Sequence, residues 1–307
     1  MLHYNKQTPI LFLVFNRPDT TALVFDEIKK AQPKRLYIAA DGARNAVEEA
    51  KCNAVREIVK DITWDCEVKT LFREKNLGCK YAVSSAITWF FDNEPEGIIL
   101  EDDCLPSQSF FGFCSELLEK YRNDNRIGHI GGSNFQDGIK RGDGTYYFSR
   151  LTHVWGWAGW RRVWKDYDVE MKTFKDFKEA DLENSPTHSL HKATWYRNLE
   201  NTYKGQINTW DYQYAYSNLI NNYLSIMPNQ NLIKNIGFGE DATHTFGDHH
   251  FANLQTGSIK EIKYPIFLMP NVEADIYTQN IEHPLPKKKN ILSRTWKGIK
   301  NSIRRKN

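Results

Sequence analysis

Residues 97–103, with the sequence GIILEDD, join a short apolar run directly to three consecutive acidic side chains. An apolar run of this length is typical of a strand that is buried on both faces of a parallel sheet. Three adjacent carboxylates repel one another unless a cation neutralises them. The stretch therefore predicts a buried strand over Gly97–Leu100 with an acidic turn at its carboxyl end.

Three earlier stretches have the same strand-like character, and each precedes a helix-like pattern. They are residues 10–15, 36–40 and 68–72. Helices are expected from a cap at Asp19 to about Lys30, over residues 47–58 and over about 79–91. Strand starts recur roughly every thirty residues, which is the length of a βαβ unit. This order predicts an α/β protein with a Rossmann-like, mainly parallel sheet flanked by helices.

Polar side chains follow all four expected strands. They are Asn16-Arg17, Asp41, Arg73-Glu74 and the acidic residues Glu101, Asp102 and Asp103. In open α/β sheets ligands bind beyond the carboxyl ends of the strands. We therefore expect a functional site where these polar groups converge on one edge of the sheet.

The strand and helix pattern loosens after residue 103, but no linker or internal repeat interrupts the chain. A helix is expected near 110–121, a strand near 127–130, and a region rich in Trp and Tyr follows from 146 to 223. The sequence predicts one domain made of two halves, 1–103 and 104–283, followed by a tail over 284–307.

Charge is distributed unevenly along the chain. The 307 residues include 41 Lys+Arg and 38 Asp+Glu, which gives +3. Residues 284–307 hold nine of these bases and no acid, so the remainder carries −6. With 40% hydrophobic and 26% charged residues the chain is not disordered, collagenous or membrane-embedded. The acidic body argues against nucleic acid as a partner.

The cysteines and the N-terminal residues bear on the cellular compartment. The five cysteines form no C-x-x-C pair, which indicates neither a disulfide framework nor a zinc site. The longest early apolar run, residues 10–15, is far shorter than a membrane span, and no signal peptide precedes it. We expect a cytoplasmic, reduced protein.

The tail has the composition of an interfacial helix. Leu292, Trp296, Ile299 and Ile303 fall on one helical face, and basic residues fill the rest. This pattern indicates binding to anionic lipid. Nucleic-acid binding and a disordered solubilising end are the alternatives. We expect residues 287–307 to hold the protein peripherally on an anionic membrane surface.

The acidic triplet is the strongest candidate for chemistry. One or two carboxylates, with water and phosphate oxygens in the other positions, commonly hold magnesium or manganese at a diphosphate. The alternative is an acidic first turn of the following helix. Asp41 can accept from the imide N–H of uracil or act as a turn residue. Arg17 can reach a diphosphate or lie free on a surface turn.

Two aromatic segments supply further candidates. Trp155 and Trp157 flank Gly156 and can present a flat face to a sugar ring, whereas core packing is the alternative for Trp157. The helical spacing of Trp157, Trp160 and Trp164 favours a core position for the last two. Asp211 lies among aromatic residues at an expected helix start, where it can act as a general base or as a cap.

One loop resembles a lid. The glycine-flanked polar stretch 237–248 contains His244, which can ligate a metal or hold a phosphate. A lone loop histidine usually does neither.

Together, in this order, these pieces resemble a nucleotide-sugar glycosyltransferase of the GT-A fold. The likeness is in particular to the N-acetylglucosaminyltransferase I family and related bacterial nucleotide-diphospho-sugar transferases, and it covers roughly residues 8–250. The motifs that carry it are Asn16-Arg17, Asp41, the triplet Glu101-Asp102-Asp103 with Pro106, Phe110 and Phe111, Gly156-Trp157, Trp210-Asp211 and the loop from Phe238-Gly239 to His244.

The resemblance implies a role for each matching position. Asp103 would ligate Mn²⁺ or Mg²⁺, with Asp102 and Glu101 near the ribose and the donor sugar. Asp41 would contact uracil, Arg17 the nucleotide or diphosphate, and Asp211 would be the general base. The loop with His244 would close over the donor. The chain departs from the family after Gly78, where Cys79-Lys80 replaces a histidine, so Lys80 would assist the phosphates.

The function so implied is a metal-dependent inverting transfer of a sugar, with N-acetylglucosamine as the sugar of the resemblance. The donor would be a UDP-sugar and the acceptor a glycan or glycolipid in bacterial surface polysaccharide synthesis. The first half would bind the donor, and the second half would bind the acceptor and supply catalysis. A sugar nucleotidyltransferase, a glycoside hydrolase and a non-catalytic sugar-binding module are the alternatives. The first of these needs a glycine-rich loop after its first strand, which Asn16-Arg17-Pro18 lacks.

Overall fold

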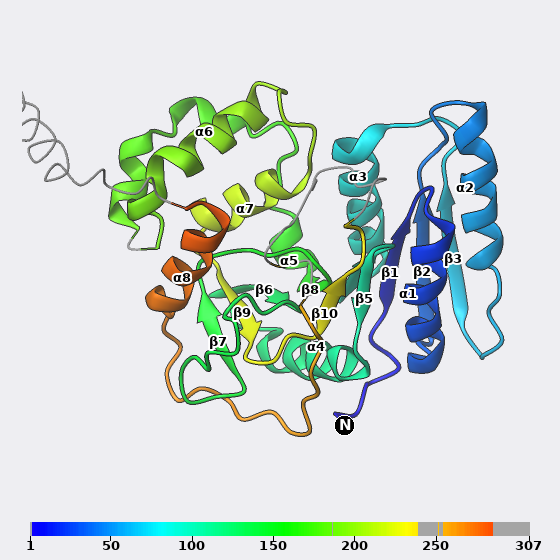
Figure 1. The fold of residues 1–307 in the computed structure, drawn as a ribbon, viewed down its shortest axis with the longest axis horizontal. Coiled ribbons are helices and arrows are strands. Elements are labelled where there is room, and N and C mark those ends of the chain that lie inside the picture. The colour runs from blue at the N-terminus through cyan, green and yellow to red at the C-terminus, as the bar shows by residue number, and fades with distance from the viewer. Residues whose placement is uncertain (1, 186, 239–250, 252–253, 285–307) are drawn as a thin grey trace, which may run out of the picture.

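A computed structural model of the chain describes residues 2–185, 187–238, 251 and 254–284 (Figure 1). The sequence-based predictions for His244 and for the tail over 287–307 lie outside these residues. Within the described residues, no helix combines the length and the apolar character needed to cross a membrane.

The described chain is built around one eight-stranded sheet, in the order β3-β2-β1-β4-β8-β6-β9-β7. Strands β1 to β4 pair in parallel, β8 runs antiparallel to both β4 and β6, and β7 runs antiparallel to β9. The expected α/β architecture with a mainly parallel sheet is therefore confirmed. The strands are β1 Ile10–Val14, β2 Arg35–Ala40, β3 Glu67–Phe72, β4 Glu96–Glu101, β6 Ile127–Gly131, β7 Tyr146–Ser149, β8 Trp157–Trp160 and β9 Leu224–Pro228.

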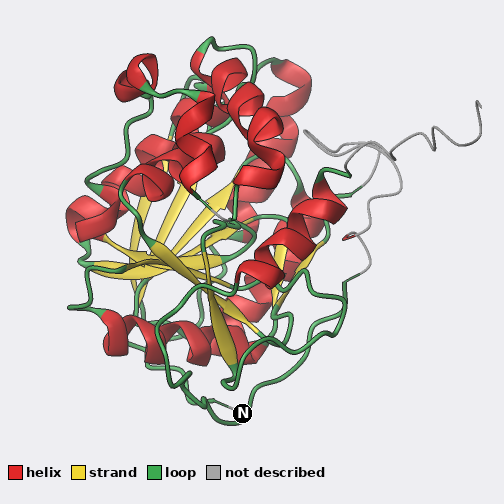
Figure 2. Cartoon of the chain, turned by 90° about the vertical axis from the view of Figure 1, so that its left-hand side faces the viewer, coloured by secondary structure: helices red, strands yellow, loops and turns green. Residues whose placement is uncertain are grey.

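Helices cover both faces of this sheet (Figure 2). They are α1 Pro18–Ala31, α2 Ala46–Ile58, α3 Gly78–Asn93, α4 Gln108–Tyr121, α5 Arg161–Trp164, α6 Lys192–Tyr203, α7 Asp211–Ile220 and α8 Val272–Glu282. Short 3-10 helices lie at Lys172–Asp176, Glu179–Asn184 and Ser189–His191. In the view of Figure 1, α6 and α7 lie above β6, β8 and β9.

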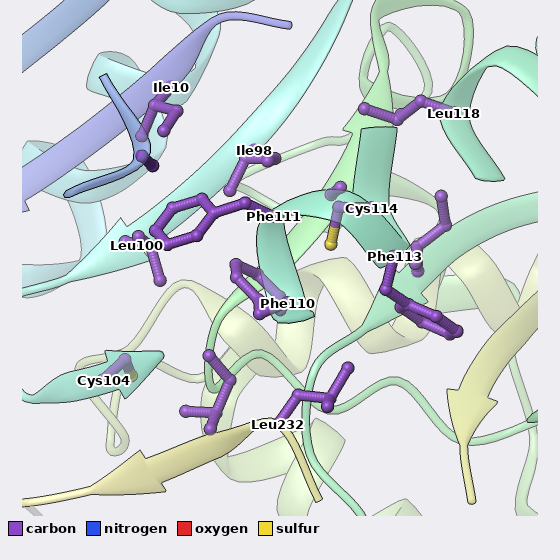
Figure 3. Packing of buried hydrophobic residues seen from close by; sticks show 14 of the residues in the cluster. Ile10, Ile98, Leu100, Cys104, Phe110, Phe111, Phe113, Cys114, Leu118 and Leu232 are labelled. Carbon is purple, nitrogen blue, oxygen red and sulfur yellow. The ribbon is translucent and has the colours of Figure 1, made fainter. Parts of the chain in front are cut away.

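Burial on both faces explains why the strands are continuously apolar. Alternate residues of β1 enter two different clusters: Phe12 packs with α1, α2 and α4, whereas Leu13 packs with α3 and α7. The ring of Phe111 of α4 lies beside Leu100 and Ile98 of β4 (Figure 3). Each such side chain contributes about 1.5–3 kcal/mol when it is fully buried.

Two local expectations are wrong. Arg17 is the cap of α1, and Asp19 lies in the first turn, because Pro18 suits the first helical position and starts the helix earlier. Trp157, Trp160 and Trp164 do not share one helix, since Trp157–Trp160 forms strand β8 between β4 and β6. Pairing with the two neighbouring strands overrides the helical spacing, although all three rings are buried as a core interpretation requires.

A small second sheet reaches toward the end of β4. It pairs β5, Cys104–Pro106, with β10, Ile233–Asn235, in antiparallel fashion. Asn235 lies opposite Cys104, so the chain that leaves β10 passes beside Asp103.

Candidate active site

The site lies where the order of the parallel strands reverses. From β1 the chain builds outward to β2 and β3, and then returns to place β4 on the other side of β1. Leu13 near the end of β1 lies opposite Glu101 at the end of β4. Ligands of open α/β sheets bind beyond the carboxyl ends of strands at such a reversal. The turns after β1 and β4, predicted separately from the sequence, are thus brought together.

Asp102 fixes the two turns to each other. The backbone N–H of Phe15 donates to its Oδ2 at 3.1 Å, and the residue is 8% exposed. Burial, followed by the nearby Asp103 carboxylate, raises the pKa of Asp102 to about 7. Asp102 therefore positions the end of β4 against the end of β1.

Asp103 is held between a guanidinium and a glycine. Arg17 Nη1 lies 2.8 Å from Asp103 Oδ2 and 4.0 Å from Asp102 Oδ1. The N–H of Ile236 donates to the Asp103 carbonyl at 2.8 Å. A Cβ at Gly237 would lie 2.3 Å from Asp103 Oδ2, so only glycine allows this close approach.

Glu101 adds a third acidic side chain to the same place, and this one has no partner among the described residues. Its half-buried carboxylate accepts no hydrogen bond and forms no ion pair within the described residues. Burial raises the pKa of Glu101 well above its usual value, and the carboxylates of Asp103, Asp102 and Asp211 raise it further. Full ionisation of the acidic triplet therefore needs more positive charge than one guanidinium supplies, and a bound cation would provide it.

The donor set suits a hard divalent cation. Carboxylate oxygens are the ligands that Mg²⁺ and Mn²⁺ prefer, and Mg²⁺ usually takes one or two of them together with substrate phosphates and water. The described residues contain no group of three or more side chains arranged to hold a metal by themselves. Asp103, with the bare carboxylate of Glu101 beside it, fits an ion that completes its ligands with phosphate oxygens and water.

Asp211 faces the triplet from α7. It is the first residue of that helix, and its Oδ1 accepts from the Thr209 hydroxyl and, at 2.9 Å, from the Tyr212 N–H. Its Oδ2 accepts no hydrogen bond from the described residues. Asp211 is near enough to Glu101 to raise the pKa of Glu101. One oxygen therefore orients the side chain, and the other is left available to a substrate.

Asp41 and Lys80 already have partners in the protein. The Asp41 carboxylate accepts from the N–H groups of Leu77 and Gly78 at 3.0 and 3.1 Å, which caps the start of α3. The side chain of Lys80 lies in the first turn of α3, with Nζ 3.4 Å from Glu170 Oε2. Asp41 therefore has a structural role, while a contact with uracil and a contact of Lys80 with phosphate stay predictions.

The two tryptophans proposed for the acceptor have different environments. Trp155 is half-buried, and its ring meets Phe135 and Phe238 edge-on at 5.3 and 5.7 Å. Trp157 is 1% exposed and stacks between His129 and Trp210. The expectation of an open ring face is wrong for Trp157, because side chains alternate along β8 and turn this ring into the core.

Sequence reasoning missed one further group of side chains on this side. His153 Nδ1 lies 3.8 Å from Glu282 Oε1, and the His153 ring meets Phe135 edge-on at 4.6 Å. Burial raises the pKa of Glu282 to about 7 and lowers the pKa of His153 to about 4. Glu282 ends α8, far along the chain, and no motif marks it. Aromatic contacts connect this group to the acidic triplet: successive rings in the series His153, Phe135, Trp155 and Phe238 pack against one another. Phe238 follows Gly237, which lies against the Asp103 carboxylate.

Comparison with known proteins gives only distant likenesses. No family model matches the sequence. No curated protein sequence matches it either. Among solved structures, 4-diphosphocytidyl-2C-methyl-D-erythritol synthase from Anaerococcus prevotii matches with a TM-score of 0.34 and 7% identity, over 57% of this chain and 80% of the other. An inositol-1-phosphate CTP transferase from T. maritima matches with 0.34 and 9%, over 57% and 84%. At these scores the likeness supports no assignment of activity.

Proposed function

We propose that the protein is a metal-dependent inverting glycosyltransferase that moves a sugar from a UDP-sugar to a glycan or glycolipid acceptor. The observation that carries the proposal is the acidic triplet at the reversal of strand order, with Asp211 near enough to raise the pKa of Glu101. The triplet suits a metal ion that also binds a diphosphate, and the separate carboxylate of Asp211, oriented through Oδ1, suits a general base. N-acetylglucosamine is the sugar that the family resemblance indicates.

The proposed chemistry assigns one role to Asp211 and another to Asp103. An inverting transfer is a single displacement, in which the acceptor oxygen attacks the anomeric carbon while the diphosphate leaves from the opposite face. Asp211 takes the proton of the attacking hydroxyl, and the Thr209 hydroxyl and Tyr212 N–H keep its carboxylate in place. The metal held at Asp103 would offset the negative charge on the leaving diphosphate.

Trp155 is the side chain that we propose for contact with the acceptor. Its half-buried ring is supported edge-on by two other aromatic rings, which leaves a fixed apolar surface of the kind that packs on a sugar ring. Peripheral attachment to the inner face of the membrane through residues 287–307 is part of the proposal, as is a place in bacterial surface polysaccharide synthesis. Both come from the sequence pattern of the tail and from the family resemblance.

The test is a panel of UDP-sugars incubated with the full chain and Mn²⁺, with release of UDP as the readout. We expect one sugar to give Mn²⁺-dependent release of UDP, and to raise the thermal midpoint in the presence of the metal. The same panel with EDTA should give neither effect. If no UDP-sugar gives release or stabilisation, the proposal is wrong.

Two further arms separate the alternatives. A sugar nucleotidyltransferase would release pyrophosphate from UTP and a sugar 1-phosphate, whereas the proposed enzyme would not. A non-catalytic sugar-binding module would bind free oligosaccharides without releasing UDP from any donor. The turn after β1, which contains Pro18 and no glycine, disfavours the first alternative because it does not form a glycine-rich cradle for a triphosphate.

A further inference from the structure

We propose that Arg17 serves as a built-in counter-cation for Asp103, and that a nucleoside diphosphate draws it away so that metal and nucleotide bind with positive coupling. This inference rests on the proposed function, because it takes the metal and the diphosphate as ligands of the same site. It assigns to Arg17 a role in the order of binding that goes beyond simple contact with a phosphate.

The first support is that the two carboxylates beside Arg17 are fixed, whereas the Arg17 side chain is long and flexible. Asp102 is tied to β1 through the Phe15 N–H, and Asp103 is tied to the chain after β10 through the Ile236 N–H. Gly237 packs directly against the Asp103 carboxylate and limits its movement further. An arginine side chain has several rotatable bonds, so the guanidinium can change partners while the carboxylates stay in place.

The second support is competition for one oxygen. Arg17 Nη1 lies 2.8 Å from Asp103 Oδ2, the carboxylate that the proposed function gives to the metal. A divalent ion and a guanidinium repel each other at this distance, so an ion that arrives alone must displace Arg17 without offering it a new partner. Asp102 does not relieve this competition, because its Oδ2 accepts the hydrogen bond from the Phe15 N–H.

The third support is the chemistry of the nucleotide. Phosphate oxygens accept guanidinium donors in the same forked geometry as a carboxylate. A diphosphate beyond the ends of β1 and β4 would offer Arg17 a partner and simultaneously supply oxygens to the metal. Each ligand would then make the other bind more tightly, and the coupling factor must be the same in both directions.

The experiment is calorimetry of Mn²⁺ and of UDP, separately and together, with the full chain and with the variants Arg17→Gln and Arg17→Lys. In the natural protein we expect UDP to raise the affinity for Mn²⁺ by about tenfold or more, within the usual range of such coupling. Arg17→Gln should bind Mn²⁺ alone several-fold more tightly than the natural protein, and should lose most of the coupling. Arg17→Lys keeps a positive charge and should retain part of it.

Arg44→Gln is the matched control. Arg44 follows β2 at the same edge and is paired with Glu48, so its removal changes the net charge by the same amount without touching the triplet. It should leave both Mn²⁺ affinity and coupling unchanged. Circular dichroism of each variant checks that the fold is kept.

Two results would overturn the inference and leave the proposed function standing. One is independent binding of Mn²⁺ and UDP to the natural protein. The other is weaker binding of Mn²⁺ alone by Arg17→Gln, which would show that Arg17 supports the metal site. If neither Mn²⁺ nor UDP binds to any form of the protein, the proposed function itself fails.

Discussion

Both edges of the central sheet carry charged side chains, but the protein pairs these side chains differently at each edge. At the amino edge, beside the start of β4 and the end of β8, Arg162 Nη2 donates to the carbonyls of Tyr121 and Ile127 at 3.0 and 2.9 Å. Arg122 forms two hydrogen bonds to Glu96 at 2.9 and 2.7 Å. At the carboxyl edge, Glu101 and one oxygen of Asp211 have no such partner among the described residues.

This contrast separates a structural edge from the edge to which the proposed function assigns the chemistry, called the reactive edge below. A surface hollow of about 420 Å³ lies at the amino edge, lined by Arg122, Arg161, Arg162 and Lys165 among others. The guanidiniums of Arg161 and Arg162 donate to carbonyls near the ends of α3 and α4, where the helix dipoles are negative and disfavour an anion. The carboxyl edge holds acidic groups that the fold leaves without partners among the described residues. Unmet charge is therefore a better guide to the chemistry than hollow volume.

The strongest test of the reactive edge is Asp211→Asn. The amide keeps the size of the side chain and can still accept from Thr209 and Tyr212, but it cannot take a proton from the acceptor. We expect turnover to fall by roughly 10²-fold or more, while UDP-sugar affinity stays nearly unchanged. Initial rates of UDP release and calorimetry with the donor measure the two effects. Unchanged turnover would remove Asp211 from the mechanism.

The second largest effect, a loss of Mn²⁺-dependent UDP binding, is expected for Asp103→Ala. Loss of this carboxylate removes the oxygen that Arg17 and the metal share, so Mn²⁺ should no longer improve UDP binding. The affinity for UDP with Mn²⁺ should fall by about tenfold or more, to the value measured without metal. Calorimetry with and without Mn²⁺ gives the comparison. An undiminished effect of Mn²⁺ in the variant would contradict the assignment of Asp103.

The reactive edge was largely foreseeable from the sequence, because its residues come directly after apolar strands. The run GIILEDD and the residues after β1 needed only the strand rule to be placed together. Trp157 shows the limit: its spacing to Trp160 indicated a helix, but pairing with β4 and β6 made a strand and buried the ring. Glu282 and His153 meet through long-range packing, which no local pattern records.

The amino edge gives a prediction of the opposite kind. Replacing Arg162 with Gln removes guanidinium donors to the carbonyls of Tyr121 and Ile127, together with the contact of the guanidinium with the Trp160 ring. We expect the free energy of unfolding to fall by about 2 kcal/mol, since hydrogen bonds from a charged group contribute more than neutral ones. Turnover at 25 °C should not change. Urea unfolding and initial rates test both statements, and a large loss of turnover without a loss of stability would undo the division between the edges.

The core between the two edges should give the smallest effect, and only at acid pH. His129 of β6 is fully buried against Trp157, and burial lowers its pKa to about 3. An unfolded histidine takes up a proton near pH 6.5, so between pH 6.5 and 3 the unfolded state binds more protons and stability falls as the pH falls.

The variant His129→Phe keeps a ring on Trp157 but removes this titration, together with the hydrogen bond between His129 Nε2 and the His153 carbonyl. It should be less stable than the natural protein at pH 7, and the difference should shrink by about 1 kcal/mol at pH 5.5 because only the natural protein pays for an unprotonated histidine there. Urea unfolding at both pH values measures the change. A difference that stays constant with pH would show that His129 takes up a proton as readily in the folded core as in the unfolded chain, and would contradict the lowered pKa of this side chain.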